Sequence, residues 1–266
     1  MAGRGDAKMT IEAQNPARRA GFWRRFGSFI ADGAFILLPL EVVVAILFAM
    51  TDGRIQGQFG LNVLGCQALT QLPPGLQTQI TNPNGAAQCA FGLPGLPTAN
   101  VLIVSRSEKN GALTTTVSES FWLDANGDLA VQAGYDVTWI AVLIFFTYIV
   151  ACEVRRGRTI GDRMVRTRVV DAAHPEVVGV PFARSIVRRV AMMIGTIPAA
   201  IVLAPAFFYR YDAAALAAYT ATPLYRYGTV ASVVIGLVWL LLIVIAIVRK
   251  KDPIYDRIAR TAVIRA

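Results

Sequence analysis

Four long runs of predominantly apolar residues divide the chain, and polar segments separate them. The runs cover residues 26–50, 137–152, 190–209 and 228–248. A helix rises ~1.5 Å per residue and must cross ~30 Å of hydrocarbon, so a span needs ~20 residues. The pattern predicts an all-α transmembrane bundle of four membrane helices, the second being the shortest.

The polar segments predict smaller structures outside the bundle. Residues 72–97 are dense in Pro, Gly and Asn and predict an irregular loop. Residues 100–132 have β-branched runs broken by Lys-Asn-Gly and Asn-Gly-Asp, which predict hairpins and a small β-meander. Residues 164–171 and 177–180 predict a β-hairpin cap, which the last residues could join as a third strand.

Composition supports a membrane protein, because 55% of the residues are hydrophobic and only 16% are charged. The basic residues are unevenly placed: 21 of the 26 Lys and Arg lie in residues 1–25, 153–190 and 249–266. Residues 51–134 hold three basic residues against five acids. The positive-inside rule therefore predicts both termini in the cytoplasm and residues 51–134 outside. We read the net charge of +9 as this bias plus attraction to anionic headgroups, and we expect no nucleic-acid binding.

These patterns predict a multi-pass membrane protein. The first run is longer than a signal-peptide core and contains acids, so we expect a retained helix. The predicted divisions are a disordered cytoplasmic tail (1–17), the first membrane helix with its basic start (18–50), an external periplasmic loop domain (51–134), the second membrane helix (135–152), a cytoplasmic basic segment with a β-hairpin (153–189), the third and fourth membrane helices (190–248) and a cytoplasmic C-terminal segment (249–266).

Cysteine placement predicts one disulfide. Cys66 and Cys89 share the external loop, whereas Cys152 lies at the inner end of the second helix. Two cysteines in an oxidising compartment favour a Cys66–Cys89 bond, the alternative being two free thiols. We expect no metal and no cofactor, because the only histidine lies on the other side and no CxxC or HxxH spacing occurs. No nucleophile triad, phosphate-binding loop or metalloprotease motif is present, so we do not expect an enzyme.

Three segments, "GFWRRFGSFIAD", "GRTIGDRMVRTRVVDA" and "YDRIARTAVI", resemble the RDD family of bacterial membrane proteins. The family is named for one arginine and two aspartates, which map to Arg25, Asp32 and Asp256. The resemblance covers about residues 18–50 and 137–266, so residues 51–134 look like an insertion. The chain departs from the family at Asp162, where a lysine is common. The resemblance implies a multi-pass protein of a bacterial inner membrane. Transport is the suspected activity of the family, and sodium/proton antiport is suspected for some members.

Asp32 poses the main chemical question, because a carboxylate inside a hydrocarbon layer is costly and points to a function. Arg25 and Asp32 share one helix face, since seven residues give about 700° of rotation, but they lie ~10 Å apart along the axis. Partners from another segment are therefore expected, and Arg188 or Arg189 at the third helix fit. Glu41 points to nearly the opposite face, where it either meets another helix or is solvated.

Two readings of Arg25, Asp32 and Asp256 stay open at this point. They form either a permanent ion pair that locks the cytoplasmic segments onto the helices, or a titrating transport site. The leading hypothesis is transport of a cation or small solute, in which Asp32 binds or relays charge. The alternative is a non-transporting scaffold or assembly factor that meets a periplasmic protein through its external loop. A homo-oligomer would suit transport, because the fourth helix has almost no polar residues.

Overall fold

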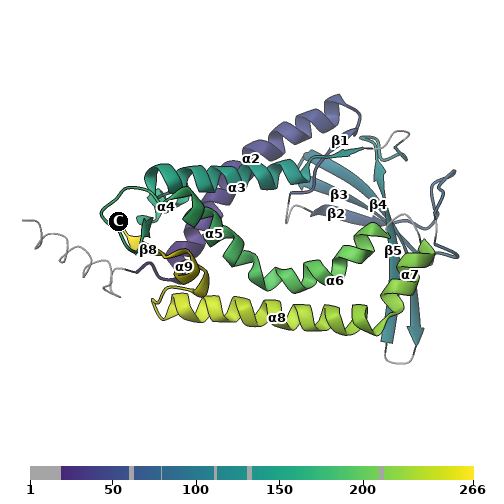
Figure 1. The fold of residues 1–266 in the computed structure, drawn as a ribbon. Helices are drawn as coiled ribbons and strands as arrows, with labels where there is room; N and C mark the ends of the chain where they lie inside the picture. Colours follow the sequence, from purple (N-terminus) through teal and green to yellow (C-terminus); the bar gives the residue numbers. More distant parts are fainter. Residues whose placement is uncertain (1–18, 60–62, 79, 111–112, 131–133, 210–212) are drawn as a thin grey trace, which may run out of the picture. The chain divides into compact units, whose positions relative to one another are not determined.

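The computed structural model describes residues 19–59, 63–78, 80–110, 113–130, 134–209 and 213–266 (Figure 1). The predicted tail, residues 1–17, lies outside the described residues. The chain forms two compact units: unit 1 comprises residues 1–32 and 147–266, and unit 2 comprises residues 33–146.

Four helical segments in the described chain are long and apolar enough to span a membrane, as predicted. They are α2 (Phe22–Met50), α3 (Thr138–Arg156), the segment Phe182–Phe208 and α8 (Pro223–Val248). Pro39 lies within α2, which continues through it. The helix α8 begins five residues before the predicted start, because Thr222 caps it and Pro223 occupies its first turn, where no amide hydrogen is needed.

The third span is interrupted. It consists of α5 (Phe182–Met192), the 3₁₀ turn η2 (Met193–Thr196) and α6 (Ile197–Phe208), which runs beside α8 in Figure 1. A Cβ on Gly195 would lie 2.6 Å from the Trp239 ring, so glycine permits this close packing. Trp239 Nε1 donates to the Met192 carbonyl at 3.1 Å, which satisfies an acceptor at the break. A short helix, α7 (Ala213–Ala221), precedes α8 and was not predicted.

The remaining elements of unit 1 are α4 (Ile160–Met164), β7 (Thr167–Asp171), α9 (Ile254–Ala259) and β8 (Thr261–Arg265). The predicted pairing of residues 164–171 with 177–180 is wrong, because residues 177–180 form no strand. The last residues do join the first strand as expected, since β8 pairs antiparallel with β7. Val180 N–H donates to the Glu153 carbonyl at 3.0 Å. Gly179, at φ +90°, approaches Val154 so closely that a Cβ would meet its carbonyl oxygen at 2.1 Å. This stretch therefore packs on the end of α3.

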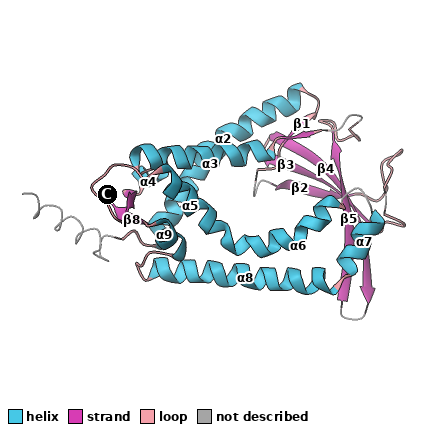
Figure 2. Ribbon diagram, in the orientation of Figure 1, coloured by secondary structure: helices cyan, strands magenta, loops and turns pink. Residues whose placement is uncertain are grey.

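Unit 2 contains a four-stranded antiparallel sheet in the order β2-β3-β4-β5, drawn like all strands in magenta in Figure 2. The pairing of β4 with β5 confirms the first predicted hairpin, whereas β2 and β3 lie before the residues predicted as a meander. The strands are β2 (Val63–Ala68), β3 (Gly85–Leu93), β4 (Leu96–Asn110) and β5 (Leu113–Leu123), beside the short parallel pair β1 (Ile55–Gln56) and β6 (Tyr135–Asp136). The fold is therefore mixed helix and sheet rather than all-α.

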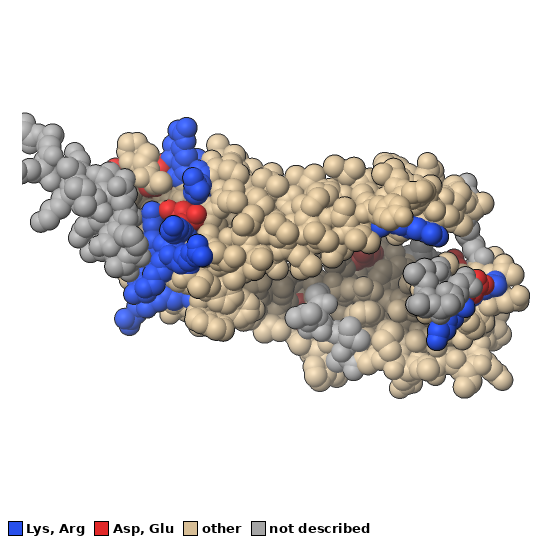
Figure 3. All heavy atoms as spheres, turned by 90° about the horizontal axis from the view of Figure 1, so that it is seen from below, with Lys and Arg blue, Asp and Glu red and all other residues tan. Residues whose placement is uncertain are grey.

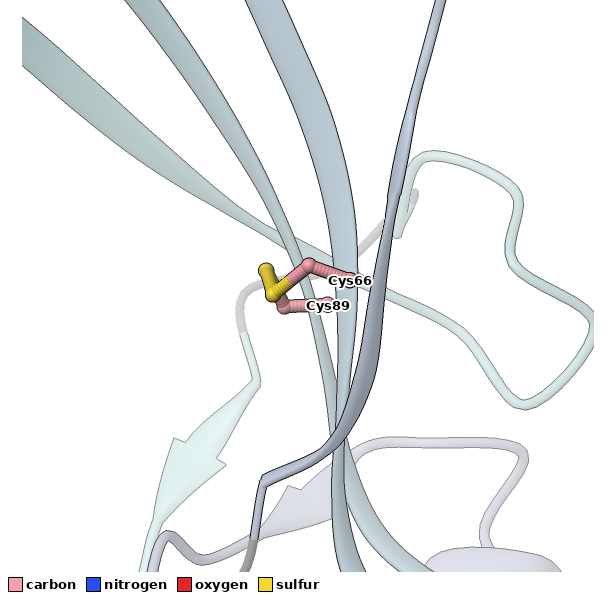
Figure 4. Close-up of a disulfide and its surroundings, with 2 residues drawn as sticks. All are labelled: Cys66 and Cys89. Carbon is pink, nitrogen blue, oxygen red and sulfur yellow. A yellow bond between two sulfur atoms is a disulfide. The ribbon is translucent and has the colours of Figure 1, made fainter.

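The irregular loop predicted for residues 72–97 is wrong over β3. This strand is central and pairs on both edges, which outweighs the weak strand preference of its Gly and Ala residues. Cys66 of β2 faces Cys89 of β3 in register, and the two form the predicted disulfide (Figure 4). Leu102, Val104 and Leu123 form the buried core of the sheet.

Candidate functional site: two buried carboxylate clusters

Unit 1 buries two groups of acidic side chains. The Asp256 cluster contains Arg25, Glu153, Arg188, Arg189 and Asp256. The Asp32 cluster contains Ser28, Asp32, Tyr148, Thr159, Gly161 and Asp162. The two clusters differ in the kind of group that satisfies their carboxylates.

Asp256 joins three helices through ion pairs. Its Oδ2 lies 2.8 Å from Nη1 of Arg25 in α2, and its Oδ1 lies 2.6 Å from Nε of Arg188 in α5. The Asp256 side chain is fully buried, and the Thr261 hydroxyl donates to Oδ1 at 3.2 Å. Every oxygen of this carboxylate therefore has a charged partner, and α9 is tied to α2 and α5.

The charges of the cluster decide the protonation state of Asp256. Burial alone would raise the pKa of this carboxyl, but the Arg188 and Arg25 guanidiniums outweigh it and hold the pKa below its ordinary value. The neighbouring Tyr255 hydroxyl has a raised pKa, because it is buried and lies near the Asp256 charge. Asp256 therefore stays ionised at neutral pH.

Glu153 of α3 is the second acid of the cluster. Its Oε1 pairs with Nη1 of Arg188 and with Nη2 of Arg189, and its Oε2 accepts from the Ser185 hydroxyl at 2.7 Å. The side chain is completely buried. Sequence analysis missed Glu153, because it lies one residue beyond the second apolar run. An acid between an apolar run and the Arg155-Arg156 pair was the available signal.

Asp32 receives uncharged donors only. Oδ1 accepts from the Gly161 amide and the Tyr148 hydroxyl, both at 2.8 Å, and Oδ2 accepts from the Thr159 hydroxyl at 2.6 Å. The residue is 4% exposed. None of the ion pairs among the described residues includes Asp32. The prediction that Arg188 or Arg189 is its partner is therefore wrong, since both pair with Glu153.

The partners of Asp32 surround the start of α4. Thr159 is the N-cap: its hydroxyl accepts from the Asp162 amide at 3.1 Å, and Asp162 Oδ2 accepts from the Thr159 amide at 3.2 Å. The Ile160 amide donates to Tyr148 at 2.9 Å, and the Gly161 amide donates to Asp32. All four amides at this helix start are therefore satisfied, two of them by carboxylates that also suit the positive end of the helix dipole.

Asp162, where the family commonly has lysine, completes the Asp32 cluster. Its Oδ1 accepts from the Ser28 and Thr167 hydroxyls, both at 2.8 Å. Ser28 lies one turn before Asp32 on α2, so Asp162 links α2 to β7 through hydroxyl groups. The spacing Thr-x-x-Asp is a capping box that the sequence itself displays.

Gly161 allows α2 and α4 to touch. A Cβ at this position would lie 2.2 Å from the Ser28 carbonyl oxygen and 2.9 Å from Asp32 Cγ. Any other residue would push α4 away from α2 and lengthen the Gly161–Asp32 hydrogen bond. The glycine of "RTIGD" is therefore a packing requirement of the Asp32 cluster.

The three residues that map to the family name, Arg25, Asp32 and Asp256, do not meet at one site. Arg25 meets Asp256, whereas Asp32 lies in the other cluster of the same unit. In unit 2, Glu41 is 1% exposed, so the alternative of a solvated Glu41 is wrong. No group of three His, Cys, Asp or Glu residues in the described parts of the chain is arranged to hold a metal ion.

Comparison with curated proteins and with solved structures gave no match. The model of the RDD family matches residues 19–260, which is most of the chain and includes both clusters. The match also runs across unit 2, which the motif resemblance left out. With four apolar helices and this match, the chain belongs to the RDD family of membrane proteins.

Proposed function

We propose that this RDD-family protein is a membrane scaffold, which holds another protein through the sheet of unit 2 and moves no solute. The observation that carries the proposal is the far end of β4 and β5. The charge distribution of the chain supports a cytoplasmic location for both termini and an external location for this sheet.

The β4–β5 hairpin extends beyond the rest of its sheet. The β3 strand begins at Gly85, which pairs with Ser105 of β4. Beyond Ser105, β4 continues to pair with β5 as far as Asn110. Residues 106–110 and 113–117 therefore form a ribbon of two strands only, which we call the outer ribbon. A two-stranded ribbon without a covered face is marginally stable in water.

The side chains that the structure describes in the outer ribbon are exposed on both of its faces, apart from the half-buried Arg106. Ser107, Glu108 and Lys109 are consecutive exposed residues of β4, and Thr116 and Val117 are consecutive exposed residues of β5. Successive side chains of a strand point to opposite faces, so neither face packs on a core. β5 is also the edge strand of its sheet, a position at which one side of a strand has no neighbouring strand. A partner protein could add a strand along this side or cover a face of the ribbon.

The two carboxylate clusters of unit 1 also support a scaffold, because their acidic groups already have partners within the chain. The Asp256 cluster uses its carboxylates in ion pairs, and the Asp32 cluster uses its carboxylates to cap α4. These contacts hold α2, α3, α4, α5 and α9 together. They are contacts that stabilise the fold rather than groups open to a ligand.

The test is site-specific crosslinking in intact cells. A photoreactive residue at Val117, which is 58% exposed, should give a discrete adduct, whereas one at Leu96, 40% exposed at the other end of the same sheet, should not. Val117→Lys should remove co-purification of the crosslinked protein, and Leu96→Lys should retain it. Equal adducts at both positions, or none at Val117, would contradict the scaffold.

A second candidate function is cation or proton transport, and one observation favours it. The donors around Asp32 are uncharged, so a proton or small cation could neutralise this carboxylate without breaking an ion pair. Proteoliposomes loaded with a pH dye distinguish the two functions. Transport requires ion-dependent proton flux that Asp32→Asn abolishes while the protein stays folded, whereas the scaffold requires no flux above that of empty liposomes.

A further inference from the structure

A cavity of about 530 Å³ lies in unit 1, where α8 runs into α9. One side is apolar and comes from the last turns of α8, through Leu242, Ile245 and Ala246. The other side is basic. Because α8 is a candidate membrane span, the apolar side continues the surface that would face lipid.

Four cations line the basic side: Arg249, Lys250, Lys251 and Arg257. All four are exposed, and within the described residues none takes part in an ion pair or a side-chain hydrogen bond. Figure 3 shows Lys and Arg side chains gathered at this end of the molecule, over the junction of α8 and α9. These charges differ from Arg25, Arg188 and Arg189, whose charges buried acids already compensate.

Arg19 adds a donor to the same cavity. One of its guanidinium nitrogens, Nη2, lies 2.8 Å from Asp252, and Asp252 is the only acid of the lining. Nη1 of Arg19 is buried without a hydrogen-bond partner among the described residues. Oδ1 of Asp252 is buried in the same state, so this ion pair leaves one polar atom of each partner unsatisfied.

We propose that this cavity binds an anionic phospholipid. The phosphate lies against the four exposed cations, and an acyl chain lies along Leu242, Ile245 and Ala246. A free phosphate would use only the basic side and would leave the apolar side in contact with water, so the two-sided lining favours a lipid. The proposal holds for a scaffold and for a transporter alike.

The experiment is native mass spectrometry of the purified full chain in detergent. The probes are phosphatidylglycerol, phosphatidylcholine of the same acyl chains, and inorganic phosphate. We expect bound phosphatidylglycerol at concentrations ~10-fold below those needed for phosphatidylcholine, and a loss of this preference as salt rises. Equal binding of both lipids, or saturation by inorganic phosphate at the same concentration, would overturn the proposal.

Two triple variants with the same loss of charge locate the site. The variant Arg249→Gln/Lys250→Gln/Arg257→Gln removes three cations of the cavity and should weaken phosphatidylglycerol binding ~10-fold or more. The control Arg155→Gln/Arg156→Gln/Arg158→Gln removes three exposed cations elsewhere in unit 1 and should keep wild-type binding. Equal weakening in both variants would show attraction to net charge only and would refute the site. If the first variant fails to fold, the lipid preference of the wild-type chain and its salt dependence still decide.

Discussion

The Asp256 cluster and the Asp32 cluster bury carboxylates in the same unit, yet they balance them by different means. Asp256 and Glu153 face three guanidinium groups, whereas Asp32 and Asp162 face hydroxyls and backbone amides. Removing one acid from the first cluster leaves a buried cation without compensation. Removing one acid from the second leaves uncharged donors unsatisfied, which costs less. The comparison separates carboxylates that compensate buried cations from carboxylates that accept from uncharged donors at a helix start.

The largest effect is expected for Asp256→Asn. This variant leaves Arg25 and Arg188 without their shared carboxylate, so we expect a loss of ~3–5 kcal/mol and little folded protein. Yield and melting temperature in detergent measure it. Glu108→Gln is the control, because its ion pair with Arg106 is exposed, at 54% for Glu108 and 38% for Arg106, and its loss should cost ~1 kcal/mol or less. Similar losses in both variants would remove the distinction between the Asp256 cluster and an ordinary surface pair.

Gly161→Ala attacks the Asp32 cluster through packing. The new Cβ would meet the Ser28 carbonyl at 2.2 Å, and backbone must move to relieve the contact, so we expect a loss of ~3 kcal/mol. Gly33→Ala is the matched control, since a Cβ there meets nothing within 4 Å and alanine favours a helix. Thermal melts of both variants decide whether the approach of α4 to α2 is as tight as described.

Asp32→Asn should have a smaller effect than either. The amide keeps one acceptor, but its NH₂ group faces the Thr159 hydroxyl or the Gly161 amide, so one hydrogen bond is lost at a cost of ~1–2 kcal/mol. The comparison with Asp256→Asn in the same melting assay is the sharpest measurement. A loss as large as that of Asp256→Asn would mean that Asp32 compensates a cation after all.

The smallest effect is a pH dependence that belongs to the Asp256 cluster. Because the folded-state pKa of Asp256 is lowered below the ordinary value of 3.8, the unfolded state takes up the proton first as pH falls. The stabilisation is complete above 3.8 and is lost as pH falls through the folded-state pKa. Melting temperatures measured from neutral to acidic pH should therefore fall more steeply for wild type than for Asp256→Asn. Parallel curves would contradict this assignment.

The sequence predicted the charged residues better than their partners. Apolar run length located four spans, and motif resemblance selected Arg25, Asp32 and Asp256. The sequence could not assign Thr159 and Gly161 as partners of Asp32, because hydroxyls and backbone amides occur throughout the chain. The two residues also lie 127 and 129 positions from Asp32. We expected an arginine as the partner of the buried Asp32. The structure instead shows that Asp32 accepts hydrogen bonds from the start of α4.

The sequence also predicted strand pairs well where the partners are close in the chain and less well where they are distant. Turn residues located the β4–β5 hairpin, because the signal there is local. Pairing of β7 with β8 joins residues 90 or more positions apart, since Asp171 faces Thr261 and Thr167 faces Arg265, so the sequence offered the last residues only as a third strand. The nearby residues 177–180 looked suitable, but Gly179 fits them against α3.

The position of Asp256 has a consequence for biosynthesis. Asp256 is 231 positions after Arg25 and 68 positions after Arg188, so the ribosome makes both arginines long before their shared carboxylate. During this interval α2, α3, α5 and α8 exist while Arg25 has no Asp256 to bind. The nascent chain therefore carries an unbalanced positive charge until translation reaches α9, and β8 then closes onto β7. The Asp256 cluster can therefore be completed only late in synthesis, after the residues of all four apolar helices have been made.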